Sequence, residues 1–331
     1  MTVDTLPYQT PFRHPQPVLT GSGIPGTYNE QAVDCPFVFR HRGHFHMLHL
    51  GFDGRGYQTA LAISDDLISW THYATILRRH DDSQDWDRAG AAGTWLLRAS
   101  DDLDGIPRLL KLDGRYWLLY HSYPGAGYEN GPAKMSWAWC EDEDLRHWHR
   151  LGHPVLSWED GAPWEQGGLY RGAVIRANGR FAMLYNAKDR QDNWLEKTGL
   201  AWSDDLIHWT RHGANPVLEG TPNAWDWRFV SDPYPVRHQG RWLNFYFGYD
   251  GHHAQEGLAW SDDLIHWGKL PQPLLSHGNA HDWDETHAHK AAVFRHHGKL
   301  YHFYCGVRPA QPSDTARCKG NECRTILLAT D

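Results

Sequence analysis

Cysteine is scarce in this sequence, and long apolar runs are missing from it. Only 5 of the 331 residues are cysteines, an odd number that argues against a full disulfide framework. No stretch approaches the roughly 20 apolar residues of a membrane-spanning helix. The N-terminus also lacks the basic and then apolar segments of a secretory signal peptide. We therefore expect a cytoplasmic protein with no membrane partner.

Positive charge is in short supply as well. The 32 lysines and arginines are outnumbered by 40 aspartates and glutamates, so the formal net charge is −8. A nucleic-acid backbone is bound by concentrated Lys and Arg, and this composition argues against such a partner. Helical periodicity is nearly absent too, which favours an all-β protein.

Tryptophan, by contrast, is in excess, with 18 copies. Proteins use this residue in aromatic cores, in repeated motifs and on surfaces that stack against sugars. One motif, typified by Ala-Trp-Ser-Asp-Asp-Leu-Ile-His-Trp, recurs four times with closing residues Trp70, Trp148, Trp209 and Trp267. Two copies, 199–209 and 257–267, are identical. Such repetition indicates a repeated supersecondary unit.

Each unit also contains a hairpin pattern, in which an apolar run, a turn with glycine and an aromatic run follow one another. The five hairpin turns contain Gly43, Gly114, Gly179, Gly240 and Gly298. Each unit is therefore interpreted as four antiparallel strands, A to D, and five units predict a five-bladed β-propeller. Residues 15–20 repeat the tail after each closing tryptophan, so we expect an N-terminal strand to close the ring. This leaves no room for a second domain in residues 1–331.

Propeller topology sorts the acidic residues by face. The D–A connections and B–C loops open on one face, and the A–B and C–D turns open on the other. The acids of the repeated turn lie on the second face, where Asp and Ser side chains bind turn backbone, and we interpret them as structural. These acids are Asp65, Asp66, Asp204, Asp205, Asp262 and Asp263.

The first face collects residues that suit a carbohydrate. Cleaving a glycosidic bond needs one carboxyl group to protonate the leaving oxygen and a second to attack the sugar or activate water. The predicted catalytic residues are Asp34, Asp232 and Glu165. The predicted substrate-binding residues are Asp53, Asp104, Arg171, Asn186, Trp227, Glu285, His287, His289 and Lys290. The tryptophans that precede A strands, and could stack against a sugar, are Trp86, Trp164, Trp225, Trp227 and Trp283.

Each of these residues also has a structural interpretation. Asp34 could cap a strand before Cys-Pro, and Asp232 could start a turn before its proline. A single histidine could be core packing. His287 and His289 alternate along one predicted strand, however, so their side chains point the same way beside Lys290. That arrangement favours a pocket or an ion site.

The repeated turn, the strand-A pieces Asp34-Cys-Pro and Ser-Asp232-Pro, and the Asp-Gly and Asn-Gly turns resemble the five-bladed propeller glycoside hydrolases. That group contains families 32, 43, 62, 68, 117 and 130, and the resemblance covers essentially the whole chain. It implies that Asp34 matches the strand-A aspartate of families 32 and 43, and Asp104 approximates their blade-two aspartate. Glu165 stands several residues ahead of their blade-three glutamate, which favours a less studied relative. The resemblance requires no cofactor and permits a calcium or similar ion near the axis at His287.

The predicted function is that of a glycoside hydrolase that trims the end of an oligosaccharide or polysaccharide, with a furanosidic bond among the options. Two alternatives stay open. A glycoside phosphorylase needs one carboxylic acid, and phosphate, which replaces the attacking water, could bind Arg171, Arg228, His289 and Lys290. A non-catalytic sugar-binding propeller tends to repeat one site per blade, whereas the D–A loops differ between these blades.

Overall fold

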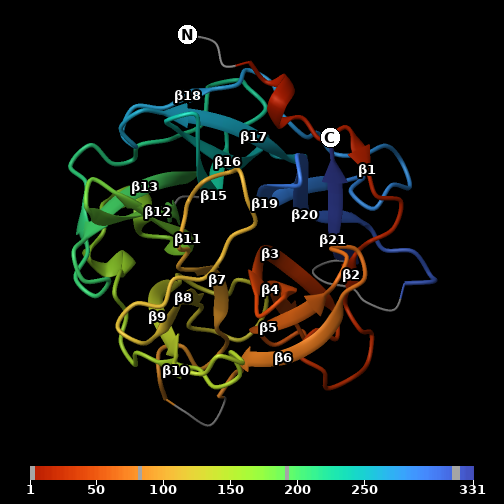
Figure 1. Ribbon diagram of the computed structural model, residues 1–331, viewed down its shortest axis with the longest axis horizontal. Coiled ribbons are helices and arrows are strands. Elements are labelled where there is room, and N and C mark those ends of the chain that lie inside the picture. The colour runs from red at the N-terminus through yellow and green to blue at the C-terminus, as the bar shows by residue number, and fades with distance from the viewer. Residues whose placement is uncertain (1–3, 81–83, 191–193, 315–320) are drawn as a thin grey trace.

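Sheets that surround a common axis make up the protein, as the computed structural model shows (Figure 1). It describes residues 4–80, 84–190, 194–314 and 321–331. No α-helix occurs among these residues, which confirms the all-β prediction. Three short 3₁₀ helices are present: η1 (Leu6–Tyr8), η2 (Trp158–Asp160) and η3 (Pro163–Glu165). Within the described residues, no helical segment has the length and apolar character that crossing a bilayer requires.

The strands form five blades of antiparallel strands in chain order, and the first strand of each blade lies innermost. Blade one consists of β3 (Ala32–His41), β4 (His44–Phe52), β5 (Tyr57–Ser64) and β6 (Thr71–Leu77). Blade two consists of β7 (Ala92–Leu96), β8 (Tyr116–Ser122), β9 (Lys134–Cys140) and β10 (His149–Arg150). Blade three consists of β11 (Gly168–Ala177), β12 (Arg180–Lys188), β13 (Glu196–Ser203) and β14 (Thr210–Arg211). Blade four consists of β15 (Phe229–His238), β16 (Arg241–Tyr249), β17 (Ala254–Ser261) and β18 (Gly268–Lys269).

Blade five joins the two ends of the chain. It consists of β19 (His287–His296), β20 (Lys299–Pro309), β21 (Glu322–Thr330) and the N-terminal strands β1 (Phe12–Arg13) and β2 (Leu19–Thr20). Both N-terminal strands pair with β21, in the registers Phe12↔Thr330 and Leu19↔Ile326. The ring is therefore closed by an N-terminal segment, as predicted, and the edge of β21 is covered.

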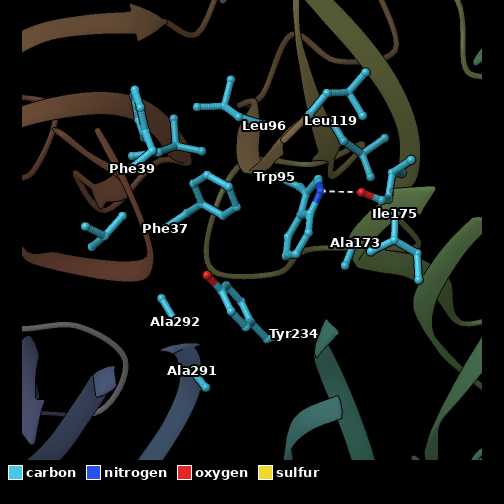
Figure 2. Packing of buried hydrophobic residues seen from close by; sticks show 14 of the residues in the cluster. Phe37, Phe39, Trp95, Leu96, Leu119, Ala173, Ile175, Tyr234, Ala291 and Ala292 are labelled. Atoms are coloured by element: carbon cyan, nitrogen blue, oxygen red, sulfur yellow. Dashed lines mark hydrogen bonds between the residues drawn. The ribbon is translucent and has the colours of Figure 1, made fainter. Parts of the chain in front are cut away.

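Aromatic side chains from different blades fill the axis below one end of the ring. Phe37, Trp95 and Tyr234 are fully buried and meet there (Figure 2). The centroids of the Phe37 and Trp95 rings lie 5.1 Å apart, and those of Trp95 and Tyr234 lie 5.3 Å apart. The indole N–H of Trp95 donates a 2.8 Å hydrogen bond to the carbonyl of Val174 in blade three. This packing closes the axis, so a cavity at that end has a solid floor.

An insertion between β7 and β8 closes the other end. The loop crosses the centre of the ring in Figure 1 and binds the ends of innermost strands in other blades. The Leu103 amide donates to the Arg237 carbonyl, and the Leu103 carbonyl accepts from the Arg295 amide, both at 2.8 Å. The Asp101 carboxylate accepts from the Arg176 amide at 3.0 Å. The predicted hairpin at Gly114 is reduced to a single bridge between Leu112 and Arg115, because the insertion interrupts the strand.

The repeated Ser-Asp-Asp-Leu turn is held by its own side chains, as the sequence predicted. In one copy, the Asp205 carboxylate accepts from the amides of Ile207 and His208, at 2.9 and 2.8 Å. The indole of Trp209 donates to the carbonyl of Leu206 at 2.7 Å. The copies around Asp66 and Asp263 repeat these bonds. The turn therefore fixes the geometry between strands C and D in several blades.

Candidate active site

The starts of the innermost strands and the B–C loops enclose a pocket at the end of the axis away from the insertion. Its volume is about 210 Å³, which suits a single sugar ring. All five blades contribute to its lining, as the propeller topology predicted for this face.

Aromatic and charged side chains both line the pocket. The aromatic rings come from blades one to four and include Tyr57, Tyr123, Tyr128, Tyr170, Trp194 and Phe247. The charged and imidazole side chains of blades four and five, which we call the charged wall, are Arg228, Asp232, His287, His289, Lys290 and Arg324. A sugar has apolar C–H faces and polar hydroxyl edges, so it can contact both kinds of side chain at once.

β-Bulges direct key side chains into this pocket. Strands β3, β15 and β19 each carry a bulge near their start. Cys35, Asp232 and Lys290 occupy equivalent positions in these bulges, with φ of 50°, 50° and 68°. A bulge re-aims a side chain, and a positive φ at a residue other than glycine is a strained conformation that tends to occur at functional sites. All three residues line the pocket.

Asp34 lies directly behind the charged wall. It is fully buried and is not among the pocket-lining residues, although its neighbour Cys35 is. Its carboxylate accepts from the ammonium of Lys290 at 2.7 Å and from the guanidinium of Arg324 at 3.3 Å. Burial favours the neutral acid, but these two cations hold the pKa of Asp34 well below its usual range. Asp34 is therefore an ionised anchor for two pocket cations.

His287 and His289 of β19 both line the pocket, and their ring centroids lie 5.8 Å apart. His289 Nδ1 lies 3.0 Å from the Cys305 carbonyl, to which it donates. Burial, together with Lys290 and Arg324, lowers the pKa of His289 well below its usual value, so the ring is neutral. A calcium ion prefers six to eight oxygen ligands. Among the described residues, His287 belongs to no cluster of three carboxylate, imidazole or thiol groups close enough to share an ion.

Asp232 is the pocket carboxyl group with the clearest proton-carrying character. It is 5 % exposed, and burial raises its pKa to about 6 even though Lys290 and Arg171 oppose the shift. The guanidinium of Arg171 lies 3.9 Å away. Among the described residues, no group donates a hydrogen bond to this carboxylate. The surroundings of Asp232 therefore favour its protonated form more strongly than water favours that of an exposed carboxyl group.

Glu196, at the start of β13, is a second pocket carboxylate, and the sequence analysis missed it. It accepts hydrogen bonds from Ser231 Oγ at 2.6 Å and from Asn186 and Trp194, both at 3.0 Å. Burial raises the pKa of Glu196, and Lys188 opposes that shift. Ser231 precedes Asp232 directly, so the two carboxyl groups share one part of the pocket.

Glu165, which the sequence predicted as a catalytic residue, does not line the pocket. Its carboxylate accepts from the hydroxyl of Tyr185 and from the guanidinium of Arg211, both at 2.8 Å. The same arrangement occurs in three other blades, where an acid joins a B-strand tyrosine to a cation of the outer strand. The equivalent triplets are Asp87–Tyr120–Arg150, Asp226–Tyr246–Lys269 and Asp284–Tyr304–Arg13. Glu165 therefore cross-links its own blade.

The tryptophans before these acids are part of the same cross-link. Trp86, Trp164 and Trp225 stack on the tyrosines Tyr120, Tyr185 and Tyr246, with ring centroids 5.9 to 6.1 Å apart. Trp283 packs beside Tyr304 in blade five. One ring face of Trp86, Trp164 and Trp225 is therefore used inside the blade, although Trp225 also borders the surface hollow beside Trp227.

Three predicted substrate contacts lie elsewhere. Asp104 belongs to the insertion at the opposite end of the axis, where it pairs with Arg295 at 3.2 Å. Asp53 closes its own loop through the amides of Arg55 and Gly56. Glu285 accepts from the His281 amide at 2.8 Å and is outside the pocket lining. Each of the three carboxylates is bound by protein groups outside the pocket.

The remaining predicted contacts fall into two groups. Those that line the pocket are Arg171, Asn186, His287, His289 and Lys290. Trp227 lies outside it, beside a neighbouring surface hollow. The pocket residues missed from the sequence include Glu196, Tyr123, Tyr128 and Arg324. Tyr123 and Tyr128 lie in a B–C loop, which the topology had placed on this face, whereas Glu196 and Arg324 lie near the starts of C strands, and no motif marks any of the four individually.

Comparison with known proteins gives consistent matches. A family model for the glycosyl hydrolases family 32 N-terminal domain matches residues 103–287, more than half of the chain. A solved structure of a BT0996 RGII complex is 27% identical, with a TM-score of 0.79 over 98% of this protein and 92% of the relative. Another solved structure, a glycoside hydrolase, is 26% identical, with a TM-score of 0.78 over 97% of this protein and 92% of the relative.

Among curated proteins, a 1,2-β-oligomannan phosphorylase from Thermoanaerobacter sp. (strain X514) is 26% identical over 155 residues. That alignment spans 46% of this chain and 44% of the phosphorylase, less than half of its length. The family model, the propeller and the carboxyl groups of the axial pocket agree with one another. The chain belongs to the glycosyl hydrolases family 32 N-terminal domain family, within the five-bladed β-propeller superfamily of enzymes that act on glycosidic bonds.

Proposed function

We propose that this protein is a glycoside hydrolase that removes the terminal sugar of an oligosaccharide or polysaccharide. Asp232 donates a proton to the leaving oxygen, and Glu196 accepts a proton from the attacking water. The observation that carries this proposal is the pKa of Asp232, which burial raises to about 6 at a position aimed into the pocket. A general acid works best when its pKa lies near the operating pH.

The division of roles between the two carboxyl groups follows from their hydrogen bonds. Three donors converge on Glu196, and donors stabilise the ionised form of a carboxylate. Asp232 receives no such bond from the described residues, so the shared proton of the pair belongs on Asp232. Two carboxyl groups whose surroundings differ in this way provide one acid and one base. None of these steps requires a metal ion.

Asp34 acts through its neighbours in this scheme. Its carboxylate holds the ammonium of Lys290 at 2.7 Å, and Lys290 lines the pocket. In this proposal Asp34 is therefore a positioning residue, and not the base or nucleophile that the sequence suggested. All participating residues belong to one propeller, which supports a single catalytic domain over residues 1–331.

Removal of a terminal sugar follows from the shape of the pocket. The aromatic packing of Phe37, Trp95 and Tyr234 fills the axis beneath it, and the insertion covers the far end. A saccharide chain cannot pass through the ring along this axis. The pocket therefore holds the terminal sugar, and the rest of the saccharide extends out through the pocket mouth. The RGII complex of a structural relative supports a carbohydrate as the ligand.

Phosphorolysis is the second candidate. The curated phosphorylase matches 46% of the chain, and Arg171, Arg228, His289 and Lys290 line the pocket. Arginine and lysine are the usual phosphate-binding residues. In that case phosphate attacks the sugar and Asp232 remains the proton donor. Hydrolysis is preferred because Glu196 supplies the second carboxylate that activation of water needs.

The test is product analysis on a panel of oligosaccharides of differing linkage, with and without inorganic phosphate. Hydrolysis predicts free terminal sugar in both conditions, and the Glu196→Gln variant should lose most activity. A strict phosphate requirement with sugar 1-phosphate as the product would establish the second candidate and reject the first. Absence of cleavage across a broad panel would contradict both.

A further inference from the structure

Trp227 differs from the other tryptophans of the protein in its exposure. All 18 tryptophans lie in the described residues, and Trp227 is the most exposed of them, at 44 %. Large apolar side chains exposed beside a binding pocket mark contact surfaces for a ligand. Trp227 takes no part in the cross-link that uses Trp225, two residues earlier in the chain.

The indole of Trp227 is held in a fixed orientation. Its Nε1 donates a 2.6 Å hydrogen bond to the carbonyl of Asp250, so the edge of the ring is anchored. The Asp250 carboxylate in turn accepts from the amides of His252 and His253, at 2.7 and 2.8 Å. Trp227 and Asp250 border a hollow that also includes Asn223. We name these three residues the blade-four shelf.

The blade-four shelf adjoins the mouth of the pocket. Arg228 follows Trp227 and Tyr249 precedes Asp250, and both Arg228 and Tyr249 line the pocket. The Arg228 amide donates to the Tyr249 carbonyl at 3.0 Å, which ties the two segments together. A ligand that leaves the pocket along this side therefore meets the shelf next.

We propose that the blade-four shelf binds the second sugar residue of the substrate, on the leaving-group side of the bond that is cut. This inference rests on the proposed function, in which the terminal sugar fills a blind pocket and the rest of the chain leaves by its mouth. An anchored indole offers a flat apolar surface to the C–H face of a sugar. The amide of Asn223 and the carboxylate of Asp250 supply polar partners for hydroxyl groups.

The shelf predicts a preference for longer substrates that depends on an aromatic ring at position 227. The probes are a series that starts with the methyl glycoside of the terminal sugar, which has no second sugar, and continues with the disaccharide of the cleaved linkage; the readout is the ratio of kcat/KM for the disaccharide over the methyl glycoside. Trp227→Ala should lower this ratio about tenfold, whereas Trp227→Phe should retain most of it because stacking survives. Melting temperatures of both variants check that each is folded.

The outcomes separate the two proposals. If the wild-type enzyme cleaves the series and the ratio is the same in Trp227→Ala, the shelf is contradicted and the hydrolase stands. If the ratio falls equally in the alanine and phenylalanine variants, stacking is contradicted as its basis. If the wild-type enzyme cleaves no saccharide, the proposed function fails and the shelf fails with it.

Discussion

The ammonium of Lys290 donates a 2.7 Å hydrogen bond to the carboxylate of Asp34, and both side chains are buried. Asp34 belongs to the first blade and Lys290 to the fifth, so the bond spans the closure of the ring. It also fixes a cation at the pocket surface, where Lys290 occupies a bulge with φ of 68°. One ion pair thus serves both the fold and the site.

Replacing Asp34 should destabilise the protein strongly. Asp34→Asn leaves a buried ammonium without its carboxylate, a change that costs about 3 to 5 kcal/mol of unfolding free energy. The double variant Asp34→Asn/Lys290→Met removes both charges and should regain much of that loss. Urea unfolding of the two variants measures the difference. Equal stability of the single variant and the wild type would contradict the role of Asp34 as an anchor.

The ion pair of Asp34 and Lys290 also predicts how the stability of the fold depends on pH. The folded pKa of Asp34 lies below its unfolded value, which is about 3.9. Its stabilising contribution is therefore present above about pH 4 and is lost as the pH falls toward the folded pKa. The stability gap between the wild type and Asp34→Asn should shrink below about pH 4. A gap that stays constant down to pH 3 would argue against an ionised Asp34 in the folded protein.

Asp232 should control the alkaline limb of the activity profile. Its pKa is about 6, so the proton-donating form is lost as the pH rises through that value and kcat/KM should fall. The ionisation of Asp232 affects the stability of the fold with the opposite sign to that of Asp34. Because its folded pKa is raised, Asp232 destabilises the fold progressively between about pH 4 and pH 6, by roughly 3 kcal/mol in total.

Asp232→Asn removes this penalty, and the variant should therefore unfold at higher urea concentration than the wild type at pH 7. At about pH 4 the two proteins should differ little, because the penalty develops only as the pH rises above the unfolded pKa of about 3.9. A variant less stable than the wild type at pH 7 would mean that Asp232 is an ionised structural residue.

We expect Glu165, unlike Asp232, to stabilise the fold and to take no part in the reaction. Glu165→Gln removes the charge that faces Arg211 at 2.8 Å and should cost about 3 kcal/mol of stability. Its kcat/KM, measured well below the melting temperature, should stay near the wild-type value. A large loss of activity in a fully folded Glu165→Gln enzyme would restore the catalytic role that the sequence suggested.

The insertion that closes the far end of the axis should contribute to stability through Leu103. Leu103 is fully buried, so Leu103→Ala should cost about 2 to 5 kcal/mol. Asp104→Ala is a matched control at the next position, because that side chain is 61% exposed and its surface ion pair is worth at most about 1 kcal/mol. Similar melting temperatures for the two variants would contradict a packed insertion.

The fold was predictable because its determinants are local and repeated. Every bond that shapes the Ser-Asp-Asp-Leu turn joins residues within three positions of each other, as Asp205 and His208 show. The local sequence therefore determines the whole turn. The closing strand was predictable for the same reason, since residues 15–20 repeat a tail seen elsewhere in the chain.

The pocket was less predictable because its contents depend on partners distant in sequence. Glu165 and Asp232 both stand near the start of an innermost strand, and the difference lies in Tyr185 and Arg211, which donate hydrogen bonds to the Glu165 carboxylate. A signal did exist for that case, since a tryptophan precedes the acid in four blades. Glu196 had no such signal. Asp104 was misplaced because the insertion turns it to the other end of the axis.

The most direct test of the account compares Asp232→Asn with the wild type on two substrates that share the terminal sugar. One carries a nitrophenyl leaving group, which needs little protonation, and the other is the natural saccharide, which needs a proton donor. Loss of a general acid should lower kcat/KM on the saccharide by about 10² to 10⁴ and far less on the nitrophenyl glycoside. Equal losses on both substrates, or none on the saccharide, would contradict Asp232 as the proton donor.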